Sequence, residues 1–206
     1  MTLGMIGLLL GASFASGINL YATVATLGLL HRFDVIALPP ALHVLAHPAV
    51  VWIALALYLV EFVADKLPAV DHVWDLLHTF VRPPAAALLA YAAVSPAPVP
   101  EAWRLVAALL AGTVALTAHA TKATARGAVN ASPEPFSRAV ISVGEDVLAA
   151  TVAWLAVAHP VVAGVAVLFL LALSVALLVV FFRVARGLWR RLLGRRSVPN
   201  EKPAPV

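Results

Sequence analysis

Apolar residues run along this chain in long stretches, and the polar positions between them indicate where helices begin and end. A helix needs about 20 residues to cross the apolar core of a bilayer. The pattern predicts six such spans, at residues 5–30, 48–66, 83–100, 103–122, 138–157 and 161–182. We therefore expect an all-α, polytopic membrane bundle of about six transmembrane helices, forming one domain over residues 1–182.

The stretch between the second and third spans has the pattern of an amphipathic helix. Four polar residues follow one another at intervals of four, three and four, which places them on one helix face: Asp71, Asp75, His78 and Arg82. Apolar residues occupy most of the opposite face, and two prolines follow at positions 83 and 84. We expect a short helix near residues 69–80 that is either re-entrant or lies at the membrane surface.

A second polar stripe appears later in the chain and is basic where the first is acidic. Its members are spaced by three, four and four residues: His119, Lys122, Arg126 and Asn130. Opposite charges favour contact, so we expect the two stripes to meet. Two alternatives stay open, namely a contact with an anion or lipid headgroup, and an ordinary cytoplasmic helix end rich in basic residues.

Acidic side chains also fall within or at the edge of the predicted spans, where ionisable groups are costly and commonly functional. Glu61 and Asp65 share a helix face, whereas the adjacent Glu145 and Asp146 project about 100° apart. With Asn19 of the first span, they form the predicted ion-binding set: Glu61, Asp65, Glu145, Asp146 and Asn19. The predicted charge-balancing or anion-binding set is Lys66, Arg82, His119, Lys122, Arg126 and Asn130.

Carboxylate and imidazole groups are suitable ligands for Mg²⁺, Mn²⁺, Ca²⁺ or Zn²⁺. Asp71, Asp75 and His78 are therefore candidate ligands for a divalent metal ion, which is the one cofactor that the sequence suggests; the alternative is a hydrated polar face. The chain carries no phosphate-binding glycine loop, nucleophile elbow or HExxH motif. We expect transport or binding rather than catalysis.

Composition supports a membrane location. Hydrophobic residues make up 63% of the 206 residues and charged residues only 12%, against about 25% charged in soluble domains. Mean hydropathy is +0.98. The absence of cysteine excludes disulfides, thiolate metal sites and a cysteine nucleophile.

The net charge of +4 comes from the C-terminal tail, residues 183–206, which contains six arginines. Residues 1–182 hold seven Lys and Arg against nine Asp and Glu. Positive charge marks the cytoplasmic side, so six spans predict a protein of the bacterial cytoplasmic membrane with both termini in the cytoplasm. The expected partners are the bilayer and anionic lipids at the tail, with no nucleic acid; self-association into a homo-oligomer stays open.

Two segments of the chain resemble each other. Residues 16–30 align with residues 143–157, which pairs Gly17 with Gly144 and Asn19 with Asp146, and each segment is followed later by Ala-His-Pro. Internal repeats are common in transporters. A true repeat and a chance match between alanine-rich segments both stay open.

The two polar stretches, EFVADKLPAVDHVWDLLHTFVRPPAAALLA and HATKATARGAVNASPEPFS, resemble a bacterial family of small integral-membrane proteins that is catalogued only as a domain of unknown function. The resemblance covers roughly residues 10–182 and implies a membrane location. Where that family has Asn after PFS, this chain has Arg138. The segment around Glu61 and Asp65 also resembles the E-x-G-D-K helix motif of cation/proton exchangers, with wider spacing and Ala64 in place of glycine.

These observations lead to a primary hypothesis and two alternatives. The primary hypothesis is a small transporter or channel for a cation, either a divalent metal or a proton-coupled ion, which uses an acidic cluster near the cytoplasmic side. One alternative is a membrane enzyme or binder that acts on a phosphorylated lipid headgroup. The other is a structural membrane partner.

Overall fold

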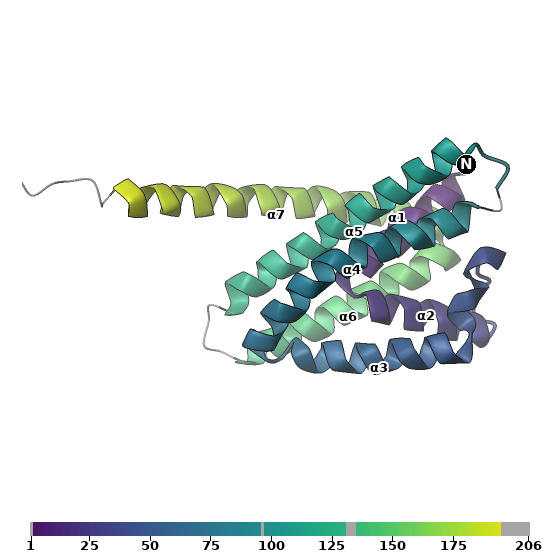
Figure 1. Cartoon of the computed structure of the whole chain (residues 1–206), viewed down its shortest axis with the longest axis horizontal. Coiled ribbons are helices and arrows are strands. Elements are labelled where there is room, and N and C mark those ends of the chain that lie inside the picture. The colour runs from purple at the N-terminus through teal and green to yellow at the C-terminus, as the bar shows by residue number, and fades with distance from the viewer. Residues whose placement is uncertain (1, 96, 131–134, 195–206) are drawn as a thin grey trace, which may run out of the picture.

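The computed structural model of the chain describes residues 2–95, 97–130 and 135–194, and these ranges contain helices and no strands. The all-α prediction is confirmed. The helices form one elongated bundle (Figure 1). In chain order they are α1 (Leu3–Ile18), α2 (Leu20–Arg32), the 3₁₀ helix η1 (Pro40–Ala46), α3 (Pro48–Ala64), α4 (Pro68–Val94), α5 (Glu101–Asn130), α6 (Pro135–Ala158) and α7 (Pro160–Gly194).

Local sequence signals explain where these helices begin. Proline suits a first turn because its φ is fixed and its missing N–H is not needed there. It begins five segments, at Pro40, Pro48, Pro68, Pro135 and Pro160. The hydroxyl of Thr2 caps α1 by accepting the N–H of Met5 at 3.2 Å, and the side-chain carbonyl of Asn19 caps α2 by accepting the N–H of Ala22 at 2.9 Å.

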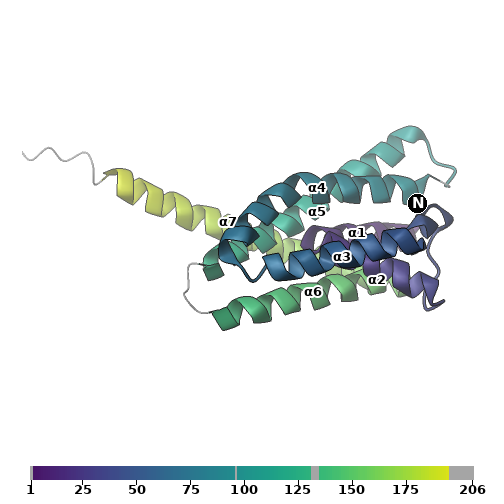
Figure 2. The same ribbon diagram turned by 60° about the horizontal axis from the view of Figure 1, so that its bottom comes forward.

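The first predicted span, residues 5–30, proves to be two helices. The chain breaks at Asn19, where the backbone is extended (φ −148°, ψ 103°), and α2 returns to the end of the bundle at which α1 begins (Figure 2). A pocket at that end is lined by Met5 of α1, Leu38 from the segment after α2, and Pro160 at the start of α7. α1 and α2 therefore form a helical hairpin whose tip is Asn19.

The predicted short helix at residues 69–80 and the predicted third span at residues 83–100 also need correction. α4 continues through both prolines as one helix of 27 residues. Two prolines remove only two main-chain donors, and helices inside a bundle tolerate this because neighbouring groups satisfy the freed carbonyls. The polar stripe of α4 is buried, while Val73, Leu77 and Phe80 on its other faces are exposed.

Fewer helices qualify as membrane spans than the six predicted. Among the residues that the structure describes, three helices are long and apolar enough to cross a bilayer, namely α5, α6 and α7, and there are four if the bent pair η1 and α3 counts as one span. Three features account for the difference within the described residues. α3 by itself has only 17 residues. The break at Asn19 shortens α1 and α2, and the charged residues of α4 lower its hydropathy. The architecture is that of a membrane protein built from apolar helices.

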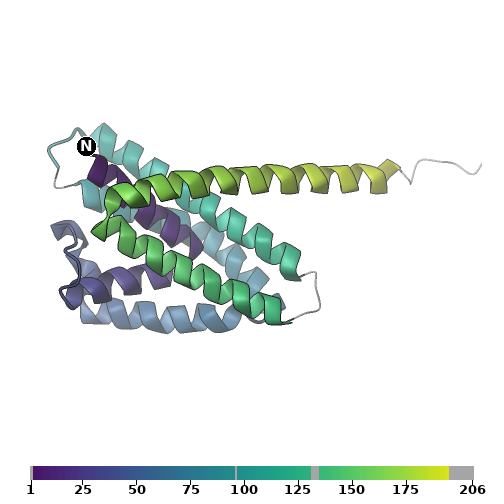
Figure 3. The ribbon, with the colours of Figure 1, turned by 180° about the vertical axis from the view of Figure 1, so that it is seen from behind.

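The two ends of the described chain lie at opposite ends of the bundle (Figures 1 and 3). α3 to α7 each run along the bundle, whereas α1 and α2 together return to their starting end. The expectation that both termini share one side depended on an unbroken first span. α7 continues as a helix to Gly194 and so includes the first part of the predicted tail.

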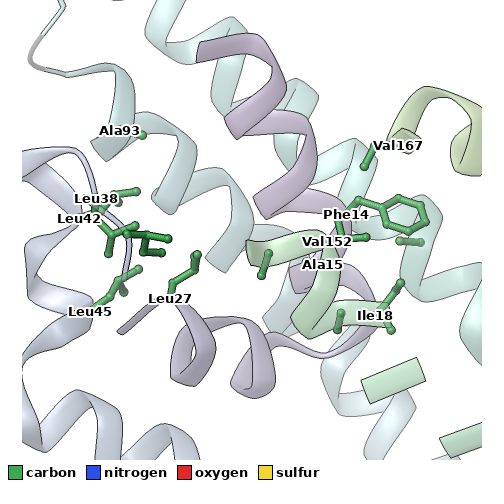
Figure 4. Close-up of a cluster of buried hydrophobic side chains, with 14 residues drawn as sticks. Phe14, Ala15, Ile18, Leu27, Leu38, Leu42, Leu45, Ala93, Val152 and Val167 are labelled. Atoms are coloured by element: carbon green, nitrogen blue, oxygen red, sulfur yellow. The ribbon is translucent and has the colours of Figure 1, made fainter. Parts of the chain in front are cut away.

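α1 is the central helix of the bundle and packs against α4, α5, α6 and α7. Small residues allow this close packing. A Cβ on Gly7 would overlap the backbone of Pro160, and one on Gly17 would overlap the backbone of Ala115. Figure 4 shows the buried apolar cluster around the hairpin, which includes Phe14, Ala15, Ile18, Leu27, Leu38, Leu42, Leu45, Ala93, Val152 and Val167.

Candidate functional site

Seven charged residues from four helices and the turn after α3 form one connected set inside the bundle. We call it the ion-pair network: Glu61, Asp65, Asp71, Arg82, Lys122, Arg126 and Glu145. Every member is buried except Glu145, whose side chain is 14% exposed. The predicted contact between the acidic and basic stripes is present, because Arg126 of α5 binds Asp71 of α4.

Arg126 forms hydrogen bonds with three carboxylates of this network. Its Nη2 donates to Asp65 Oδ2 at 2.5 Å, its Nη1 donates to Asp71 Oδ1 at 2.8 Å, and its Nε donates to Glu145 Oε2 at 2.9 Å. A guanidinium presents five donors in a rigid plane, so one arginine can hold several carboxylates at once. Arg126 thereby ties α5 to α4, to α6 and to the end of α3.

Glu61 is the second centre of the network and is fully buried. Its Oε1 accepts from Arg82 Nη2 at 2.5 Å and from Lys122 Nζ at 2.9 Å. The same Lys122 ammonium lies 3.6 Å from Asp65 Oδ2 and 3.8 Å from Glu145 Oε2. Lys122 thus connects the two centres of the network.

The helix break supplies two further acceptors. Arg82 Nη1 donates to the carbonyl of Gly17 at 3.0 Å, and Lys122 Nζ donates to the carbonyl of Ile18 at 3.1 Å. The last carbonyls of a helix lack main-chain partners and carry partial negative charge. Two buried cations therefore hold the end of α1 at the level of the ion-pair network.

His119 adds no positive charge to this region. Its Nδ1 lies 2.9 Å from Arg82 Nη1, and its Nε2 lies 3.0 Å from the carbonyl of Asp75. Arginine is only a donor and a carbonyl is only an acceptor. His119 must therefore accept at Nδ1 and donate at Nε2, which describes a neutral imidazole.

Asp146 has surroundings unlike those of the network. Its Oδ1 accepts from Asn19 Nδ2 at 2.8 Å, and its Oδ2 accepts from the Tyr58 hydroxyl at 3.2 Å. Its exposure is 7%, and among the described residues no cationic side chain forms an ion pair with it. We call these three residues the hairpin site. The two positions that align in the internal resemblance, Asn19 and Asp146, contact each other.

Carboxylates outnumber cations in the interior that the structure describes. The ion-pair network has four carboxylates against three cations, and Asp75 and Asp146 add two more. The Oδ1 of Asp75 is buried with no hydrogen-bond partner within the described ranges. Because a buried charge is costly unless it is paired, this region favours an additional proton or cation.

Two of the three predicted metal ligands take other partners. Asp71 binds Arg126, while His78 contacts the carbonyl of Trp74 at 2.7 Å and the hydroxyl of Tyr21 at 3.0 Å. Across the described parts of the chain, no group of three His, Asp or Glu side chains is placed to hold a metal ion. The geometry gives no support to a divalent metal at Asp71, Asp75 and His78.

Among the described residues, the predicted charge-balancing residue Lys66 forms no ion pair with the ion-pair network. Lys66 Nζ donates to the carbonyl of Phe62 at 2.7 Å and lies 3.0 Å from the centre of its ring. Partial burial lowers the pKa of this ammonium, which sits in the turn between α3 and α4. The side chain of Asn130 lies outside the described residues.

Sequence reasoning missed two polar side chains that contact these acids. Tyr58 binds Asp146, and the buried Ser142 donates to Asp65 Oδ2 at 3.4 Å. Helical spacing could have found both. Tyr58 precedes Glu61 by three residues, and Ser142 precedes Glu145 by three, so each shares a face with a predicted site residue.

A family model described as "Domain of unknown function (DUF4126)" matches residues 6–180. No curated protein and no solved structure matches the chain.

Proposed function

We propose that the chain, which belongs to the DUF4126 family, is a small membrane transporter for a monovalent cation that binds in exchange with a proton at Asp146. The observation that carries this proposal is the environment of Asp146. This carboxylate of α6 is buried against the tip of the α1–α2 hairpin, and its described partners are the neutral donors Asn19 and Tyr58. A buried carboxylate in such a place is stabilised by a proton or a bound cation.

The helical hairpin supports the same function. Transporters place ion sites where helices are interrupted, because the ends of half-helices and unwound backbone supply charge and ligands at that depth. Here the carbonyl end of α1 and the first turn of α2 meet at Asn19. Asn19 is fully buried and reaches Asp146 on α6 directly.

The ion-pair network has a different task in this proposal. Its carboxylates Glu61, Asp65 and Glu145 already bind arginine or lysine, so they hold the helices in register around the hairpin. They also hold the Lys122 ammonium within the network. The predicted binding set is thereby divided. Asp146 and Asn19 contact the ion, and the other three acids position the helices.

The alternative function, binding of a phosphorylated lipid headgroup at the network, has less support. A phosphate site needs cations whose charge is available. Arg82 and Lys122 share Glu61, and Arg126 holds Asp65. Each buried cation is thus already matched by carboxylate, and the excess charge of the region is negative.

We propose that the end of the bundle with the α3–α4 turn and the arginines of α7 faces the cytoplasm, following the positive-inside rule. The start of α1 then faces the opposite compartment. The hairpin enters from that compartment, and its tip reaches the network from the far side. This arrangement suits alternating access, since the site at Asn19 lies between the two ends of the bundle.

The test uses the full chain in proteoliposomes with an imposed pH gradient. We expect addition of Na⁺ or K⁺ to dissipate the gradient, as followed by a pH-sensitive dye. Asp146→Asn should abolish this response. Asp34→Asn is the matched control, because Asp34 is exposed and has φ 57°, a conformation that asparagine also adopts.

Two outcomes would contradict the proposal. One is a wild-type protein that leaves the gradient intact with every monovalent cation. The other is an Asp146→Asn variant that transports as well as Asp34→Asn.

A further inference from the structure

α7 leaves the bundle and forms a groove with α5 that shares no lining residue with the hairpin site. Figure 3 shows α7 diverging from its neighbours toward its C-terminal end. The groove has a volume of about 810 Å³, which lies within the range of ligand-binding pockets. Its lining includes Thr117 of α5, and α7 supplies the other residues: Val175, Leu178, Val179, Phe182, Arg183, Ala185, Arg186 and Trp189.

The lining changes character along α7. Apolar side chains occupy the first part, two arginines follow, and Trp189 comes last. The segment from Pro160 to Phe182 contains 23 residues, which span about 34 Å. A bilayer core is about 30 Å thick. Arg183 and Arg186 therefore lie at the level of the lipid headgroups, where tryptophan is also favoured.

We propose that this groove binds one acidic phospholipid, with its acyl chains along the apolar part and its phosphate at Arg183 and Arg186. Charge complementarity selects an anionic headgroup, because the described lining contains two cations and no acidic side chain. The order of apolar and charged residues along the groove also matches the orientation of a lipid in a bilayer, because the apolar part of the groove lies toward the membrane centre. The proposal does not depend on cation transport.

Native mass spectrometry of the full chain tests this site, with phosphatidylglycerol and phosphatidylcholine as the probes. We expect phosphatidylglycerol to bind more tightly. Arg186→Gln should weaken its binding about fivefold and leave phosphatidylcholine unchanged, as expected for one arginine near an anionic surface. Inorganic phosphate should not displace the bound lipid, because it makes no contact with the apolar lining.

Arg191→Gln is the matched control. Arg191 is exposed on the same helix but lies five residues after Arg186, about 140° around the axis and away from the groove. It should bind phosphatidylglycerol as the wild type does. Melting temperatures of both variants should equal that of the wild type, because these arginines are exposed.

Several results would overturn the proposal. Equal weakening by Arg186→Gln and Arg191→Gln would indicate diffuse attraction by the whole tail. Equal binding of the two lipids would remove the charge selectivity. Displacement by inorganic phosphate would show that the arginines recognise phosphate without the acyl chains.

Discussion

Glu145 and Asp146 are adjacent in the chain, yet they belong to two regions that stabilise buried charge in different ways. Glu145 belongs to the ion-pair network, where it contacts Arg126 and Lys122. Asp146 belongs to the hairpin site, where Asn19 and Tyr58 donate to it. The 100° between successive residues of α6 is enough to place them in different surroundings.

The difference separates a structural role from a binding role. A carboxylate that is matched by a guanidinium is already compensated, and removing either partner leaves the other charge buried and unpaired. A carboxylate held by neutral donors keeps its charge available for a proton or a cation. We therefore expect substitutions in the ion-pair network to change stability most, and substitutions in the hairpin site to change transport most.

The largest loss of stability should follow Arg126→Gln. This change leaves Asp65, Asp71 and Glu145 without their shared guanidinium, and removing one partner of a buried ion pair costs about 3–5 kcal/mol. Reversible unfolding in detergent micelles measures it. The control is Arg104→Gln, whose ion pair with Glu101 is 3.5 Å long and partly exposed, so that about 1 kcal/mol or less is at stake. Equal losses of unfolding free energy for the two variants would mean that the ion-pair network does not stabilise the fold.

A double-mutant cycle on Glu61 and Arg82 should show the next largest effect. Both side chains have no exposed surface, and their closest atoms are 2.5 Å apart. Glu61→Gln takes from Arg82 its one described carboxylate, and Arg82→Gln leaves Glu61 with Lys122 alone. The double change removes both charges. We expect a coupling energy of about 0.5–3 kcal/mol from the four unfolding free energies. Simple additivity would show that Lys122 alone compensates Glu61.

Much of the site follows from the sequence because it depends on local spacing. The stripe from Asp71 to Arg82 and the stripe from His119 to Arg126 were visible as helical periodicity, and their opposite charges predicted contact. The pairing of Glu145 with Arg126 connects residues that are 19 positions apart. Their common depth in the bundle could be inferred, although the contact depends on how α5 and α6 pack.

The fold was harder to predict where a local signal competes with packing. Asn19 lies in an apolar run long enough for one span, and at the break its side chain donates to Asp146, which is 127 residues away. Pro83 and Pro84 predicted a helix end, but α4 continues because it packs along α5, where Gly112 lies beside the carbonyl of Pro83. Single-sequence periodicity contains neither of these tertiary contacts.

The two adjacent acids allow a direct comparison of smaller effects. Glu145→Gln should cost about 1–3 kcal/mol, since it weakens the contacts of Arg126 and Lys122 with a charged acceptor. Asp146→Asn should cost less than about 1 kcal/mol, because asparagine keeps the shape and forms neutral hydrogen bonds. Transport should show the opposite order, with only Asp146→Asn inactive. A greater loss of stability for Asp146→Asn than for Glu145→Gln would remove the distinction between the two regions.

The smallest change in stability should follow Tyr58→Phe, which removes one donor from Asp146 and no charge. The hydrogen bond is 3.2 Å long and partly buried, so its loss should cost about 0.5–1 kcal/mol. The substitution should affect transport more strongly than it affects stability. A hydroxyl that donates to a carboxylate favours the ionised form, so without it Asp146 keeps its proton to higher pH. The pH of half-maximal transport should therefore rise.

Tyr91→Phe is the matched control, because the Tyr91 hydroxyl binds the exposed Glu101 at 2.6 Å. If Tyr58→Phe left the pH profile where Tyr91→Phe leaves it, Asp146 would not be the group whose ionisation controls transport, and the hairpin site would have to be reassigned to a packing role.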